Sequence, residues 1–398
     1  MKKKTYQQLT GYFHAVALSL IVSGIFSACT KSSTTVKTGP VLPAEAIRGT
    51  TLSGGNVKGV MLTDSVYTVN GDLTVLKGDT LSVQPGATIN IPANHAFYIQ
   101  GTIISAGTQA KPVVFQSPVA QPGQWGGFQC DSAQAVTFKW TKVLWAGGPD
   151  SSGSTRQTIG ISKPMVVDIE DSWFIGGQDN AIGGYSTATV TILRNTFQGE
   201  GTTDGDAIDF HSGVTGTVAY NVLWGGAGSA IKVFTSSTIK NPQTNVTVYN
   251  NTCVDNGFRR GAAEPGRGIL VDAFSFGNYY NNLLVNNYFG LDITPTSDFA
   301  NVKYGYNYFF GTVDSLVKNF YPAGSKGVPQ STDIISQTTG ANDPMFVNYT
   351  PPPNPSLRIM PANFDFHLKP GSPAIGKGNP TYNNDIGAYT TDGKGNLH

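Results

Sequence analysis

Short runs in which apolar and polar residues alternate recur along the chain, and one of them returns four times in its middle part. The four copies read DAIDF at 206–210, SAIKV at 229–233, RGILV at 267–271 and FGLDI at 289–293. The second residue of each copy is small, and these small residues are 23, 38 and 22 positions apart. A five-residue strand that returns after about one coil's length predicts a solenoid of stacked coils.

An asparagine recurs in phase with this strand, at Asn195, Asn221, Asn251, Asn282 and Asn307. Asparagine tolerates left-handed backbone, and its amide can hydrogen-bond the same group in the coils above and below. We therefore expect the five side chains to stack at one corner of the solenoid and to satisfy backbone groups there.

Together, the strand repeat and the asparagine repeat resemble the right-handed parallel β-helix of the pectate lyase superfamily. In that family each coil contributes one strand to each of several sheets, and asparagines stack at one bend. The resemblance implies an all-β, single-stranded right-handed parallel β-helix. It does not imply one activity, because the superfamily includes lyases, hydrolases, epimerases, adhesins and non-catalytic proteins.

The composition agrees with many short strands and tight turns, since the 398 residues include 48 Gly and 23 Pro and only 13% are charged. The strand pattern predicts coils over residues 51–315. Residues 316–398 resemble the closing segment of chondroitinase-B-like and alginate-lyase-like β-helix proteins. We expect this segment to cover the last coil, with His367 as a packing residue, because a bare solenoid end exposes apolar core and strand edges.

The N-terminus predicts export. Three lysines at positions 2–4 precede an apolar run over 13–26, which is short for a membrane span, so residues 1–28 read as a signal peptide. The sequence Phe26-Ser27-Ala28-Cys29 resembles a bacterial lipobox with Phe where Leu is usual, which implies lipidation of Cys29; the alternative is a plain signal peptide. Residues 29–50, rich in Ser, Thr and Gly, then form a flexible tether.

This reading places the protein in the cell envelope, attached to the membrane through its N-terminal lipid only. We expect the periplasmic side of an outer membrane, with the cell surface or secretion as alternatives, and a monomer. Without residues 1–28 the chain has 23 basic and 25 acidic residues, which argues against a nucleic-acid partner. Cys130 and Cys253 align with inward positions, so we expect buried free thiols rather than a disulfide.

Because strand side chains alternate, the residue between two inward positions points outward. The predicted outward column reads Gln129, Ser162, Gly183, Asp209, Lys232, Leu270, Asp292, and the next column reads His211, Phe234, Asp272, Thr294. Asp209 and Lys232 on adjacent coils should be within ion-pair reach. Asp292 lies three coils from Asp209, roughly 14 Å at about 4.8 Å per coil, too far for the roughly 6.5–9.5 Å of an inverting glycosidase.

One coil is longer than its neighbours because of an insertion over residues 255–267. Insertions in solenoids lie in turns and often form a binding surface. We expect its arginines, Arg259, Arg260 and Arg267, to bind acidic sugars together with Asp272 and Asp292 on the strands. A solvated loop without a ligand is the alternative.

These ionisable residues suggest polysaccharide cleavage by elimination, which needs a cation for the uronate carboxylate, a base for the adjacent proton and a proton source for the leaving oxygen. Asp204, Asp206 and Asp209 offer oxygen ligands for Ca²⁺, and Lys232 or His211, beside Asp209, could be the base. The order of aspartates and lysine is similar to that of certain calcium-dependent pectate lyases, which show a tighter acidic doublet. The same residues also fit a plain turn and a surface ion pair.

Two functions therefore remain open from the sequence. The first is a polysaccharide lyase-like protein for acidic, uronate-containing glycans. The second is a non-catalytic lipoprotein that binds glycan or contributes to the structure of the envelope.

Overall fold

The computed structural model describes residues 45–238 and 240–398. The predicted signal peptide, Cys29 and most of the predicted tether lie outside these residues. Within the described part, strands dominate, and the helices are α1 (Asp314–Val317) and the single 3-10 turn η1 (Phe299–Asn301). None of the described helices has the length and apolar character needed to span a membrane.

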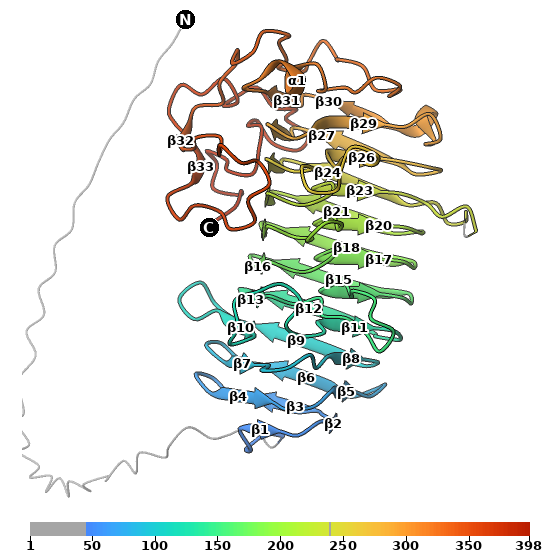
Figure 1. Cartoon of the computed structure of the whole chain (residues 1–398), viewed down its shortest axis with the longest axis vertical. Helices are drawn as coiled ribbons and strands as arrows, with labels where there is room; N and C mark the ends of the chain where they lie inside the picture. Colours follow the sequence, from blue (N-terminus) through green and yellow to red (C-terminus); the bar gives the residue numbers. More distant parts are fainter. Residues whose placement is uncertain (1–44, 239) are drawn as a thin grey trace, which may run out of the picture. The chain divides into compact units, whose positions relative to one another are not determined.

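Three long parallel sheets make up the body, and each coil contributes one strand to each sheet (Figure 1). Sheet 1 consists of β1 (Thr51–Leu52), β4 (Val66–Val69), β7 (Thr88–Asn90), β10 (Val113–Gln116), β13 (Thr141–Leu144), β16 (Trp173–Ile175), β19 (Thr196–Gln198), β22 (Val222–Trp224), β25 (Thr252–Val254), β28 (Leu283–Val285) and β31 (Tyr308–Phe310). Sheet 2 consists of β2 (Gly55–Asn56), β5 (Leu73–Val75), β8 (Phe97–Ile99), β11 (Phe128–Cys130), β14 (Ile159–Ile161), β17 (Ile182–Gly184), β20 (Ile208–Phe210), β23 (Ile231–Val233), β26 (Arg267–Val271) and β29 (Phe289–Ile293). Sheet 3 consists of β3 (Gly59–Met61), β6 (Thr80–Val83), β9 (Thr102–Ala106), β12 (Ala135–Lys139), β15 (Met165–Glu170), β18 (Ala188–Leu193), β21 (Thr215–Ala219), β24 (Asn245–Tyr249), β27 (Phe276–Tyr280) and β30 (Lys303–Gly305). This architecture is the predicted parallel β-helix.

The register of sheet 2 confirms the predicted column over the middle coils. Gly183, Asp209, Lys232, Leu270 and Asp292 pair in sequence across β17, β20, β23, β26 and β29. The column is wrong at one earlier coil, where Gly160 rather than Ser162 pairs with Gln129 and with Gly183. The strand β14 therefore lies two residues earlier than expected.

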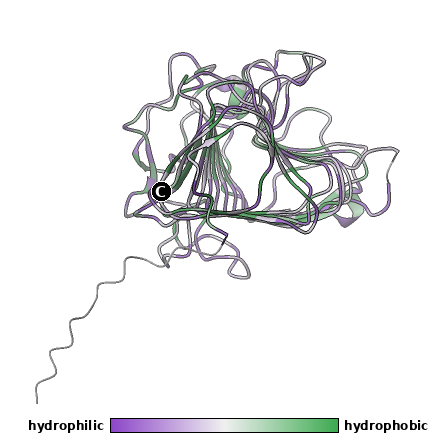
Figure 2. Cartoon of the chain, turned by 90° about the horizontal axis from the view of Figure 1, so that it is seen from below, coloured by the Kyte–Doolittle hydropathy of each residue, from purple (hydrophilic) through white to green (hydrophobic). Residues whose placement is uncertain are grey.

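The interior is filled by the inward side chains of all three sheets, which form one continuous cluster along the stack. Figure 2 looks along this stack and shows the strands of successive coils lying over one another. Cys130 and Cys253 are buried free thiols of sheets 2 and 1, as predicted. Strands this short hold together because alternate side chains bury apolar area at every coil.

The five asparagines form the predicted ladder at the corner between sheets 3 and 1. Each Nδ2 donates to the Oδ1 of the next asparagine at 3.0, 2.9, 3.0 and 3.1 Å, in the order Asn195, Asn221, Asn251, Asn282, Asn307. The left-handed residue at this corner is the one before each asparagine, for example Tyr220 (φ 58°). The prediction that the ladder asparagine itself takes left-handed backbone is therefore wrong, because its role is to hydrogen-bond while its neighbour makes the bend.

The segment after β31 closes the end of the β-helix and also packs against its side. Residues around Val317 and Phe320 close the interior at the last coil, and the Phe320 carbonyl accepts a hydrogen bond from the Leu291 amide. Beyond them, β32 (Phe346–Asn348) and β33 (Asp365–Leu368) form an antiparallel pair. This later part packs against the outward side chains of sheet 1, in a second apolar cluster that includes Trp224 and Phe366. The closing segment thus covers a side of the helix as well as its end.

The chain joins the helix slightly before the predicted start at 51. The Ile47 amide donates to the Val60 carbonyl at 2.9 Å, so the last residues of the predicted tether already contact the first coil. At the other end, β31 stops at Phe310, five residues before the predicted boundary at 315.

Candidate functional site

An ionisable cluster lies on the outer face of sheet 2, at β20 and β23. The ammonium group of Lys232 is 3.8 Å from Asp209 Oδ2 and 3.9 Å from Asp206 Oδ2. Asp209 and Lys232 are neighbours because they occupy one outward column of adjacent parallel strands. The side chain of Asp206 is 2% exposed and that of Lys232 is 12% exposed, so this ion pair is largely removed from water.

His211 extends the cluster toward solvent. Its Nε2 lies 2.7 Å from Asp209 Oδ2, and its side chain is 26% exposed. If Nε2 carries the proton and donates to Asp209, Nδ1 is the nitrogen that can accept a proton. This is the arrangement of a carboxylate-oriented general base, and the predicted residues Asp209, His211 and Lys232 do come together.

Three residues that sequence reasoning missed, Tyr185, Asn180 and Gln157, complete this corner. The ring of Tyr185 packs on that of His211, with centroids 4.4 Å apart. Asn180 Nδ2 and Gln157 Nε2 both donate to Tyr185 Oη at 3.2 Å. The hydroxyl proton of Tyr185 is therefore not used in these two bonds. Asn180 also donates to Asp209 Oδ2 at 3.2 Å, which links the tyrosine to the column.

Charges within the cluster set its protonation. Burial, and then the charge of Asp209, raise the pKa of Asp206 to about 6, against the lowering effects of Lys232 and Arg260. For Lys232, burial lowers the pKa, but Asp209 and Asp206 outweigh this effect, so its pKa is raised. Lys232 is therefore protonated at neutral pH and acts as a cation, not as the base that the sequence offered as one choice. Burial, followed by the charge of Asp209, raises the pKa of Tyr185, which keeps its proton.

The insertion at 255–267 brings two of its three predicted arginines to this face. Arg260 Nε is 2.9 Å from Asp204 Oδ1, and its Nη1 is 3.6 Å from Asp206 Oδ2. Arg267 Nε is 3.1 Å from Asp292 Oδ2. Lys232, Arg260 and Arg267 thus form a row of cations along β20–β29, each held by carboxylates.

Asp272, in the neighbouring column, is engaged by hydroxyl groups. Thr294 Oγ1 and Thr296 Oγ1 donate to its Oδ1 at 2.7 and 3.1 Å. The other predicted neighbours in this column, His211 and Phe234, are in ring contact at 5.1 Å.

Arg259 does not join the site, which corrects its prediction as a substrate-binding residue. Its guanidinium donates to the carbonyls of Thr202, Gly225, Glu200, Gly201 and Leu357, at 2.8–3.2 Å. Burial, and then the charge of Arg358, lower its pKa to about 10. Its donors are used to fasten the insertion to the turns of the helix and to the C-terminal segment, so none is left for a sugar.

Beside Arg259, the buried carboxyl of Glu200 predicts a pH-dependent stability. Burial raises its pKa from 4.5 to about 8, against the lowering effects of Arg358 and the Gly177 amide. Because the folded state holds this proton more tightly than the unfolded state, folding free energy is lost as pH rises from about 4.5 to 8. We expect Glu200→Gln to make the fall in stability between about pH 5 and 8 shallower by on the order of a few kcal/mol, measured by chemical denaturation. Glu264→Gln, at an exposed carboxyl, serves as control and should keep the wild-type slope; equal slopes in all three proteins would contradict the prediction.

The predicted calcium ligands do not fit a calcium ion in this arrangement. Asp204 is 67% exposed and binds Arg260, while Asp206 Oδ2 and Asp209 Oδ2 lie beside Lys232. A cation of the protein is therefore already next to each carboxylate, although Asp209 Oδ1 is buried without a hydrogen-bond partner among the described residues. Asp206 Oδ1 also accepts a hydrogen bond from the Ser229 amide. Over residues 45–238 and 240–398, no group of three or more His, Cys, Asp or Glu side chains is placed to hold a metal ion.

Comparison with known protein families agrees with this architecture. Residues 54–138 match the family described as pectate-lyase like beta helix domain, and residues 126–307 match the right handed beta helix region. The same comparisons found no matching curated protein and no matching solved structure. Domains of this kind indicate a polysaccharide-related protein. The chain therefore contains a pectate-lyase-like beta helix domain that overlaps a right-handed beta helix region, in agreement with its three parallel sheets.

Proposed function

We propose that the protein is a polysaccharide lyase for acidic, uronate-containing glycans, with its reaction centre at His211. The observation that carries the proposal is the Asp209–His211 hydrogen bond of 2.7 Å beside the cationic Lys232, on the outer face of the middle coils. His211 is the most exposed of these three side chains, so it is the one that a glycan reaches first.

The residues supply the three parts of an elimination. His211 Nδ1 takes the proton next to the uronate carboxylate, and Asp209 stabilises the imidazolium that forms. The electron pair of that bond becomes a carbon–carbon double bond, and the bond to the leaving oxygen breaks. Tyr185, whose hydroxyl keeps its proton, donates it to the leaving oxygen. Lys232, with Arg260 and Arg267 on the adjacent coils, provides positive charge for the substrate carboxylates.

A hydrolase with paired carboxylates fits less well. Asp206, whose raised pKa suits a general acid, is almost fully buried and is held by the Ser229 amide, Lys232 and Arg260. Asp292 lies three strands away from Asp209 and binds Arg267. Neither carboxyl is placed to work with Asp209 across a glycosidic bond.

The test is incubation of the purified protein with pectate, alginate and chondroitin, while the absorbance of the unsaturated product is followed. Product from one of them is the expected result, and it should form in the presence of a chelator because the cluster holds no fitting calcium site. No product from any acidic glycan would overturn the proposal.

The second candidate is a non-catalytic glycan-binding or structural envelope protein. It is favoured by the mutual pairing of charges in the cluster, since Lys232, Arg260 and Arg267 each already have carboxylate partners. In that case a glycan should bind without release of product, and substitution of His211 should leave retention of the glycan unchanged.

For either function, we propose export with lipid attachment at Cys29 on the periplasmic side of an outer membrane. Support comes from the basic, apolar and small-residue order of positions 1–29. The mass of the mature N-terminal peptide decides between a lipidated Cys29 and a plain cleavage.

A further inference from the structure

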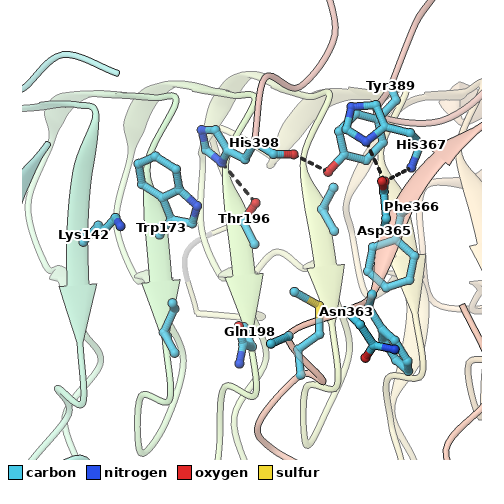
Figure 3. A pocket seen from close by; sticks show the side chains of 15 residues that line it. Lys142, Trp173, Thr196, Gln198, Asn363, Asp365, Phe366, His367, Tyr389 and His398 are labelled. Carbon is cyan, nitrogen blue, oxygen red and sulfur yellow. Dashed lines mark hydrogen bonds and ion pairs between the residues drawn. The ribbon is translucent and has the colours of Figure 1, made fainter. Parts of the chain in front are cut away.

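A second candidate binding site lies on a different face of the molecule, between sheet 1 and the C-terminal segment. It is a cavity of about 620 Å³ lined by strands β13, β16, β19 and β22 on one side and by residues 360–367, Tyr389 and His398 on the other (Figure 3). This volume lies within the roughly 300–1,000 Å³ that is usual for small-molecule sites. The ionisable cluster at His211 is on sheet 2, so the two sites are separate.

The side of the cavity formed by sheet 1 carries polar groups at successive coils. Lys142, Trp173 and Gln198 come from β13, β16 and β19, and their labelled side chains project from adjacent strands in Figure 3. The ammonium group of Lys142 lies over the Trp173 ring, 4.9 Å from its centroid, rather than against a carboxylate. Gln198 is nearly buried and brings an amide with two donors and one acceptor oxygen to the cavity.

The opposite side, from the C-terminal segment, is apolar in its middle and polar at its end. Met360, Phe364 and Phe366 supply the apolar part. The polar end has Asn363 and the pair Asp365–His367, in which His367 Nδ1 is 2.6 Å from Asp365 Oδ1. In Figure 3 this pair lies at the far end of the cavity from Lys142.

His398 forms part of the cavity wall. Its ring stacks on Trp173 with centroids 3.9 Å apart, and its Nδ1 is 3.1 Å from Thr196 Oγ1. Burial lowers the pKa of His398 to about 4, against the raising effect of a backbone hydrogen bond with Asp171. The imidazole is therefore neutral at pH 7 and adds an aromatic surface beside Trp173.

We propose that this cavity binds a short acidic saccharide of one or two sugar rings, as a site distinct from the one at His211. The combination fits a saccharide because the apolar middle can cover a ring face while amides and hydroxyl-binding groups surround its rim. Lys142 selects for a carboxylate, since its ammonium group lines the cavity over an aromatic ring and is not paired with a carboxylate of the described residues. The cavity accommodates a fragment rather than a long chain, because the C-terminal segment packs over the outer face of sheet 1 that forms one side of the cavity.

The test uses calorimetric titration of the full chain with acidic disaccharides derived from pectate, alginate and chondroitin, in a His211→Asn background that slows turnover. One of the three should bind. Lys142→Ala should weaken that binding by about tenfold and Gln198→Ala by several-fold, because each loses a direct contact. Lactose, which lacks a carboxylate, should bind more weakly than the acidic disaccharide.

Gln116→Ala is the matched control. Gln116 occupies the same column of sheet 1 as Gln198, three strands away, and lies outside the cavity. Its substitution should leave the affinity unchanged. The proposal is overturned if none of the acidic disaccharides binds, if lactose binds equally well, or if binding is the same in Lys142→Ala and Gln198→Ala as in the control. Because the titrations monitor binding without catalysis, these results do not depend on whether the protein is a lyase.

Discussion

Replacing His211 with asparagine is expected to reduce the rate of product formation from the acidic glycan by about 10²–10⁴-fold, the usual contribution of a positioned general base. Asparagine keeps a polar side chain at this position, but it cannot accept the substrate proton. Lys232 remains protonated through Asp206 and Asp209 and does not replace the base. The rate should therefore fall while glycan binding through the cations persists, which steady-state kinetics would show as a loss in kcat larger than the change in KM.

His95→Asn is the matched control for this experiment. His95 also lies beside an aspartate, with Nδ1 3.7 Å from Asp72 Oδ1, and its side chain is exposed to a similar degree. It is at the early coils, far along the chain from the cluster. Its substitution should leave kcat unchanged. An unchanged rate in His211→Asn would rule out His211 as the base, and an equal loss in both variants would point to a general effect on the fold.

Replacing Asn221 with alanine is expected to lower the free energy of unfolding by about 3 kcal/mol or more. Its Nδ2 donates to the Ile192 carbonyl and to Asn251, and its Oδ1 accepts from the amide and the side chain of Asn195. All these atoms are buried, so alanine leaves several polar groups without partners, each at a cost of about 1–3 kcal/mol. Urea denaturation followed by circular dichroism measures the effect.

Asn278→Ala is the corresponding control on the outer face of sheet 3. Asn278 is half-buried, and its side chain makes one hydrogen bond, to Thr247 Oγ1 at 3.2 Å. Its substitution should cost less than about 1 kcal/mol. A similar loss of unfolding free energy in the two variants would show that the ladder asparagine contributes no more to stability than an outer-face asparagine.

The fold was predictable because its two signals repeat. Alternation in short strands reveals inward positions, and the asparagines mark one corner of each coil, so even a weak pattern gains weight from its copies. The error at β14 arose because the register must be inferred across turns of variable length, and a three-residue strand with isoleucines at both ends, Ile159 and Ile161, can be aligned in two ways. The packing of residues 341–398 on sheet 1 was missed, since that segment has no repeat.

The site residues that lie on strands could be predicted from the sequence, whereas those that lie in loops could not. Asp209 and Lys232 were found together because one column joins them. Arg259 and Arg260 are consecutive in a loop without periodicity, and sequence alone does not tell which of the two turns inward to the backbone carbonyls. Tyr185 follows the end of β17, outside the column, although an aromatic residue just after a strand, one coil before His211, was the available signal.

The alternation of side chains along each strand also separates two kinds of substitution, those at inward positions and those at outward positions. Inward positions such as Ile208 and Ile231 form the core of the β-helix. The outward column of sheet 2, which runs from Gly183 to Asp292, lies outside this core. A new reaction or a new ligand can therefore arise along that outward line while the inward positions stay the same. In evolution, such a β-helix can keep its fold while the chemistry of its outer face changes.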